Sequence, residues 1–343
     1  MPTPAVDRLF ADTRLHVVTG KGGVGKTTVA AALSLAMAER GKRVLLAEVE
    51  GRQGISQTFD VPPLGSEEVR LVADPSGGQL WGLSVEAKPA LLEYLETFYR
   101  LGRAGTALEK VGAIDFATTI APGVRDVLLI GKVYEAARRT VGPKRGQGPL
   151  VYDAVVLDAP PTGRITRFLG VNAEVADIAK VGPIRSQADS ITRLLRDSRT
   201  RVHVVTLLEE MPVQESVDAL AELSAARFSL GAVVVNQVRE PLLAAAEAAR
   251  VAGVSGRPGA LDDPAAEVRA ALTAAGVRVT GPMLAGLLQE ARDHLDRVAL
   301  EGEMEAEILA QGLPVLHLPS LADGIEDGGI SVLADELVAQ GVR

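Results

Sequence analysis

Short apolar runs alternate with amphipathic stretches along most of the chain. The first run covers residues 14–19; a glycine-rich turn, a helical pattern at 26–40 and a second apolar run at 44–47 follow it. Strand, helix and strand in this order predict a βαβ unit and therefore a parallel sheet. Further strand-length runs lie at residues 81–85, 154–157, 202–207, 232–235 and 315–318. We expect an α/β fold with a doubly wound, mostly parallel sheet and helices on both faces.

One long stretch breaks this alternation. Residues 88–140 have a helical pattern without a strand-like run, and Ala121-Pro122-Gly123 interrupts them. The chain has 343 residues, which a single large α/β domain with an inserted piece can accommodate. We expect one domain over residues 14–343 with a helical insertion at 88–140.

Composition excludes several classes of site. The chain has no cysteine, so it can form neither a disulfide framework nor a thiolate zinc site. Its net charge of -8 argues against a nucleic-acid partner. No apolar run reaches the roughly 18 residues of a membrane span, and the N-terminus has no signal-peptide pattern. We expect a cytoplasmic protein without a transmembrane segment. The four histidines, His16, His203, His294 and His317, fall on separate elements and are expected to be packed or solvated rather than metal ligands.

The glycine-rich turn carries the clearest chemical signal. Its residues Gly20-Lys21-Gly22-Gly23-Val24-Gly25-Lys26-Thr27 match the phosphate-loop pattern and lie between a predicted strand and a helix. Such a loop curls backbone N–H groups around a β-phosphate at a helix N-terminus. Lys26 is expected to contact the β- and γ-phosphates, and the Thr27 hydroxyl to ligate Mg²⁺. The cofactors predicted are ATP and Mg²⁺, bound by residues 20–28 with Thr28 as the last member. A glycine-rich turn without a ligand is the alternative.

The full string GKGGVGKTT resembles the deviant Walker A loop of the MinD/ParA, nitrogenase iron protein and ArsA/Get3 group. In that group the first lysine reaches the phosphates of a partner subunit. The resemblance implies this catalytic role in trans for Lys21, comparable to an arginine finger. A solvated loop lysine is the alternative.

A second motif selects a branch of this group. Asp158-Ala159-Pro160-Pro161-Thr162-Gly163 and the residues after it resemble the switch II segment of ArsA/Get3 ATPases, in a short actinobacterial-type form. An Asp at the carboxyl end of a buried strand is expected to contact Mg²⁺ through water. The alternative for Asp158 is a strand-end cap.

Weaker matches extend the resemblance over residues 14–330. Asn236 stands in a Val-Asn-Gln element whose asparagine, in the family, contacts the adenine edge. A plain turn asparagine is the alternative. Pro319 and Ser320 resemble the loop that packs against adenine. Pro122-Gly123 resembles a turn of the helical subdomain, although Arg125 and Asp126 stand where an acidic pair usually follows.

The chain also departs from the family. Glu50 takes the place of the Asp that orients the attacking water, and a misplacement of about 1 Å can cost about 10²-fold in rate. We therefore expect slow or partner-dependent hydrolysis. The alternative to a water-orienting role for Glu50 is that Glu48 and Glu50 form a solvated acidic loop. Without cysteine, neither thiolate binding of arsenite nor the zinc closure of eukaryotic Get3 dimers is expected. Arg164 replaces the switch II histidine.

The resemblance implies a dimer that nucleotide opens and closes. The partner is a second copy or a paralogous ATPase, and a hydrophobic membrane-protein client, such as a tail-anchored segment, would occupy an apolar groove. Candidate groove helices lie at residues 91–99 and 127–134, whose apolar faces could equally close a small helical core. The alternative functions are a regulatory ATP-binding subunit of a heterodimer and a ParA/MinD-type positioning ATPase.

Overall fold

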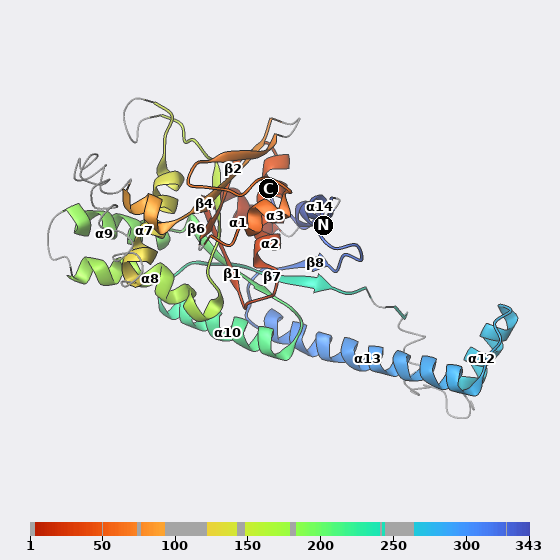
Figure 1. Ribbon diagram of the computed structural model, residues 1–343. Coiled ribbons are helices and arrows are strands. Elements are labelled where there is room, and N and C mark those ends of the chain that lie inside the picture. The colour runs from red at the N-terminus through yellow and green to blue at the C-terminus, as the bar shows by residue number, and fades with distance from the viewer. Residues whose placement is uncertain are drawn as a thin grey trace.

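One sheet of eight strands forms the centre of the computed structural model (Figure 1). The structure describes residues 4–49, 51–73, 77–92, 122–142, 148–178, 183–240, 242–243, 264–326 and 328–343. The strands are β1 (Leu15–Gly20), β2 (Arg43–Val49), β3 (Val69–Ala73), β4 (Gln79–Val85), β5 (Ala154–Asp158), β6 (Thr200–Thr206), β7 (Leu230–Val238) and β8 (Val315–Pro319). Their order is β3-β4-β2-β5-β1-β6-β7-β8, and every neighbouring pair except β3 and β4 is parallel. The predicted mostly parallel sheet is confirmed.

Alternate residues of each central strand enter two separate cores. In β2, Val44 and Leu46 pack into one core, whereas Leu45 and Ala47 pack into the other. Because both faces are covered, these strands are apolar nearly throughout. The helices of the first core are α1 (Pro4–Asp12), α2 (Lys26–Glu39), α3 (Gly54–Thr58) and α14 (Gly329–Ala339). Those of the second include α7 (Pro122–Arg138), α8 (Thr162–Ile178), α9 (Pro183–Leu195) and α10 (Glu210–Ala225). The doubly wound arrangement is thereby confirmed.

Strand β3 is an element that the hydrophobic pattern did not predict. Its five residues, VRLVA, are exposed or only partly buried and pair antiparallel to β4 at the edge of the sheet. An edge strand with one solvated face lacks the continuous apolar run of a central strand. The pattern therefore recognised its buried neighbour β4 and missed β3.

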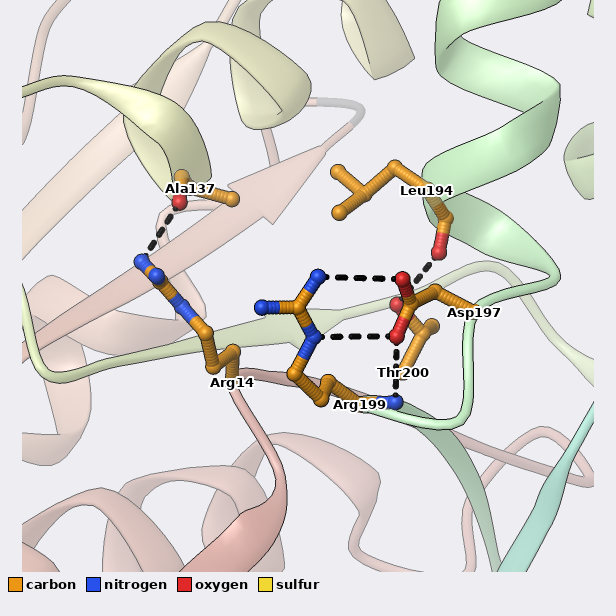
Figure 2. Close-up of polar contacts among 6 residues, drawn as sticks. All are labelled: Arg14, Ala137, Leu194, Asp197, Arg199 and Thr200. Carbon is orange, nitrogen blue, oxygen red and sulfur yellow. Dashed lines mark hydrogen bonds and ion pairs between the residues drawn. The ribbon is translucent and has the colours of Figure 1, made fainter. Parts of the chain in front are cut away.

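Helix α7 lies within the range 88–140 that the sequence predicts as an insertion. It begins at Pro122, at the predicted break, and its Leu129, Ile130 and Val133 are buried in the second core. Figure 2 shows how its carboxyl end is held: Arg14, the residue before β1, donates to the Ala137 carbonyl at 2.7 Å. The apolar side chains predicted at 127–134 thus serve core packing, while residues 93–99 of the other candidate helix lie outside the described residues.

A long arm extends from the carboxyl side of the chain. Helix α13 (Gly281–Leu309) has 29 residues, of which only Leu284 and Ile308 are buried. In Figure 1 it runs beyond the sheet and carries α12 (Pro264–Ala274) at its far end. The length of α13 was not anticipated from the sequence.

Candidate functional site

The predicted phosphate loop lies between β1 and α2, at the carboxyl ends of the central strands. Gly20 and Gly25 are fixed by close neighbours: an added Cβ would lie 2.2 Å from the Val205 carbonyl oxygen at Gly20, and 2.3 Å from Asn236 Nδ2 at Gly25. A Cβ at Gly22 or Gly23 would meet nothing within 4 Å. The backbone is therefore tight against β6 and β7 on one side and open on the other. That shape fits an anion held by backbone N–H groups.

Lys26 and Thr27 open α2 at the end of this loop. The Lys26 side chain is buried, and its Nζ donates to the Lys21 carbonyl at 2.9 Å. The Thr27 hydroxyl donates to Asp158 Oδ2 at 2.6 Å. The structure thus brings together the two residues predicted to hold Mg²⁺, although they come from distant parts of the sequence.

Asp158 ends β5 in an environment that disfavours its charge. Burial raises the pKa of Asp158 to about 6, and the Glu48 carboxylate acts in the same direction. The Thr27 hydrogen bond and the Lys26 charge oppose this rise without cancelling it. A divalent cation beside Asp158 would compensate this negative charge, so the donor set of hydroxyl and carboxylate fits Mg²⁺.

Glu48, at the end of β2, was not predicted as a site residue. Its side chain is buried, and its two carboxylate oxygens accept hydrogen bonds from the Gln53 N–H at 2.9 Å and the Ile55 N–H at 3.1 Å. The Ser84 hydroxyl donates to it at 3.0 Å. The alternative of a solvated acidic loop is therefore wrong for Glu48, because this carboxylate anchors the segment that follows β2. Only its position at a buried strand end could have signalled this role.

The anchored segment lies directly over Thr27, at the helix end of the loop. An added Cβ at Gly54 would be 3.0 Å from Thr27 Cγ2, so this backbone approaches Thr27 closely. Gln53 has a left-handed backbone (φ 57°), and its side-chain amide donates to the Leu64 carbonyl and accepts from the Leu64 N–H. Glu50, the predicted water-orienting residue, lies outside the described residues.

The switch II segment is tied both to β1 and to α7. The Thr19 hydroxyl donates to the Pro160 carbonyl at 2.7 Å, one residue before the phosphate loop begins. Arg164, which departs from the family motif, lies 3.7 Å from Asp126 of α7. The Arg164 departure in switch II is therefore paired with an acidic residue of α7 that the sequence had not connected with it.

The Lys21 side chain points away from the phosphate loop. Its ammonium instead lies 2.8 Å from Glu215 Oε1, on α10. The structure therefore places the predicted trans lysine beside its own chain's helix.

Asn236 contacts the phosphate loop itself. Its Nδ2 donates to the Val24 carbonyl at 2.9 Å, and the side chain is buried. A cavity of about 250 Å³ opens beside it, bordered by the ends of β6 and β7, the start of α10 and the middle of α13. Pro319 and Ser320 do not line this cavity; the Ser320 N–H donates to the Val238 carbonyl at 2.8 Å. The structure thus joins Asn236 to the loop, whereas Pro319 and Ser320 pair with Val238, two residues further along β7.

The two buried histidines, His16 and His203, pack against each other. His16 Nδ1 and His203 Nε2 are 3.1 Å apart, and both rings stack with Phe10. Since the Ala232 N–H donates to His203 Nδ1, the neutral His203 carries its proton on Nε2 and donates it to His16. This leaves the His16 Nε2 proton without a partner in its buried position. Among the described residues, no cluster of three or more His, Asp and Glu side chains is arranged to hold a metal.

Comparison with known proteins agrees with the geometry of the loop. The family model described as "Anion-transporting ATPase" matches residues 13–188. ATPase BagA of Mycobacterium tuberculosis (strain H37Rv) is 46% identical over 97% of this chain and 95% of its own length. The ATPase ASNA1 homolog of Entamoeba dispar is 24% identical over 64% of this chain and 75% of its own length. No helix within the described residues is both long and apolar enough to cross a membrane. The chain belongs to the ArsA family of anion-transporting ATPases, to which its ArsA/Get3-type motifs pointed.

Proposed function

We propose that this chain is a nucleotide-switched ATPase subunit that binds ATP with Mg²⁺ at residues 20–28 and Asp158. The observation that carries the proposal is the 2.6 Å contact between Thr27 and Asp158 at the open glycine loop. Mg²⁺, when bound, would neutralise phosphate charge there. Thr27 would be its direct ligand, and Asp158 would hold it through water.

The chain's own residues supply the remaining parts of the site. The Lys26 ammonium donates to a carbonyl of the loop itself. When nucleotide binds, it would exchange this hydrogen bond for one to a phosphate oxygen. Glu48 accepts hydrogen bonds from Gln53 and Ile55 and so holds the segment after β2 close to Thr27. We assign Glu50 the orientation of the attacking water and Lys21 the stabilisation of a partner subunit's phosphates.

Slow or partner-dependent hydrolysis is part of the proposal. Glu50 is one methylene longer than the Asp of the family, which displaces the carboxylate from the reacting water. We propose a dimer, with a second copy or with a paralogous ATPase. A regulatory subunit of a heterodimer is the second candidate, and the Glu50 and Arg164 departures favour it because both lie in nucleotide-responsive segments.

A hydrophobic membrane-protein client is a further element of the proposal. It rests on the family resemblance, since the apolar side chains of α7 are used in the core. The Arg164–Asp126 pair gives switch II a direct contact with α7, which supports coupling between nucleotide and the proposed helical insertion at 88–140. We propose that residues 14–343 act as one ATPase domain, in the cytoplasm.

Phosphate release by the purified chain tests the proposal. We expect Mg²⁺-dependent turnover well below 1 s⁻¹, which is slow for an enzyme, and a loss of turnover in Lys26→Ala. Rapid turnover by the isolated chain would contradict partner dependence. For the client, capture of a tail-anchored segment should differ between ATP and ADP. Equal capture in both states would argue against a nucleotide-gated groove.

A further inference from the structure

The two lysines of the phosphate loop are held in different directions. Lys26 turns back onto the loop and donates to the Lys21 carbonyl. The side chain of Lys21 leaves the loop, and its ammonium contacts Glu215 at 2.8 Å. The Lys21 carbonyl therefore takes part in the phosphate loop of its own chain, whereas the Lys21 ammonium lies at α10.

Helix α10 provides carboxylates to two parts of the nucleotide site. Glu215 and Glu222 lie about two helical turns apart and so share one side of the helix. Glu222 Oε2 accepts a hydrogen bond from the Thr166 hydroxyl at 2.9 Å, in the helix that follows Asp158. Helix α10 thus connects the Lys21 side chain with the switch II helix.

We propose that Glu215 is the resting counter-ion of Lys21. When no second subunit is bound, the Glu215 carboxylate keeps the Lys21 ammonium at α10. In the dimer, phosphates bound by the second subunit replace Glu215 as the partner of Lys21. Glu215 is a positioning residue in this scheme because it acts through Lys21. The inference rests on the proposed function, in which Lys21 acts across a dimer, and it adds the group that must release the lysine.

The exposure of this pair suits an exchange of partners. The Lys21 and Glu215 side chains are 29% and 38% exposed. An ion pair so accessible to water and salt is weak, and its loss changes an equilibrium by only a few-fold. A triphosphate offers several charged oxygens to the same ammonium, so it can compete with a single carboxylate. The resting contact therefore directs Lys21 without holding it irreversibly.

The resting pair can be tested on the nucleotide-free full chain by limited reductive methylation of lysines, followed by mass spectrometry. Glu215→Gln should raise the methylation rate of Lys21 a few-fold and leave that of Lys42 unchanged. Asp218→Asn is the matched control, because Asp218 lies on the same helix and accepts a hydrogen bond from Gln214. It should leave the Lys21 rate unchanged. Equal Lys21 rates in the wild type and in Glu215→Gln would overturn the proposal.

The release step can be tested by sedimentation velocity with a nonhydrolysable ATP analogue and Mg²⁺. Glu215→Gln should tighten self-association a few-fold, and the same substitution in a Lys21→Ala background should add nothing. Weaker association in Glu215→Gln, or equal tightening without Lys21, would overturn the proposal. Failure of the proposed function differs: Lys21→Ala would then associate and hydrolyse ATP like the wild type, while the methylation result would still report the pair.

Discussion

Two carboxylates stand side by side at the ends of neighbouring strands, and they are held in opposite ways. Glu48 on β2 pairs in register with Asp158 on β5. Glu48 is 1% exposed and accepts hydrogen bonds from two backbone N–H groups and a hydroxyl. Asp158 accepts a hydrogen bond from Thr27, yet burial still raises its pKa to about 6.

We interpret this difference as one between a structural carboxylate, Glu48, and the proposed binding carboxylate, Asp158. The hydrogen bonds of Glu48 replace the water that it loses on burial, so it can serve as a fixed anchor. The charge of Asp158 is incompletely compensated within the chain, which is typical of a group that awaits a ligand. Neighbouring positions in one sheet can thus carry the same charge for different purposes.

The largest effect is expected from Asp158→Asn. Turnover should fall on the order of 10²-fold, as when one electrostatic contact to a transition state is lost. At pH 7.5 the nucleotide-free variant should be more stable than the wild type by about 1–3 kcal/mol, because a carboxylate with a raised pKa costs stability once it is ionised. Phosphate release and thermal unfolding measure the two effects. Asp218→Asn is the control, and a less stable Asp158→Asn with normal turnover would contradict the account.

Glu48→Ala should have the opposite effect on stability. Three donors lose their acceptor, so the free energy of unfolding should fall by about 3 kcal/mol, and urea denaturation measures this. Glu48→Gln, which retains one acceptor oxygen, should fall between this variant and the wild type. A change below about 0.5 kcal/mol in Glu48→Ala would remove Glu48 from its role as an anchor.

The histidine pair extends the comparison to buried bases. Burial lowers the pKa of His203 to about 3 and that of His16 well below its usual value, so both stay neutral in the folded chain while the unfolded chain takes up protons below about pH 6.5. Stability should therefore fall as the pH falls from about 6.5 toward 3. His16→Phe, which keeps a ring against Phe10, should reduce this slope by up to about 1.4 kcal/mol per pH unit. An unchanged slope between pH 6 and 5 would show that His16 is not held neutral.

The smallest effect concerns the contact between switch II and α7. Arg164→Ala removes the ion pair between Arg164 and the buried Asp126. Stability should fall by about 1 kcal/mol, and amide exchange should become faster in α7. Arg167→Ala, an exposed arginine of the same helix, serves as the control. Equal exchange in both variants would argue against coupling through this pair.

The central strands and the phosphate loop could be predicted from the sequence because the patterns that indicate them are local. The apolar runs of β1, β2 and β5 have both faces buried, and the loop motif lies within a few residues of a strand and a helix. The position of Asp158 followed from the strand before it. Strand β3 and the length of α13 were missed because both are largely exposed and leave a weak hydrophobic pattern.

The contacts that give the site its character depend on the three-dimensional fold. Glu48 can act as an anchor because the chain after β2 turns back onto it. Lys21 contacts Glu215 because α10 packs beside the loop. The partnership of Arg164 and Asp126 likewise required α7 and α8 to lie together. Motif spacing gives no access to such pairings, because each joins residues that no local pattern connects.

Titration calorimetry with ATP tests the central claim most directly, with and without Mg²⁺, on the wild type and on Thr27→Ala. We predict binding by the wild type in Mg²⁺, weakened at least about tenfold when Mg²⁺ is removed, which corresponds to about 1.4 kcal/mol. Thr27→Ala should bind as weakly in Mg²⁺ as the wild type does without it. The absence of binding heat in the wild type, or equal affinity under all four conditions, would contradict the account.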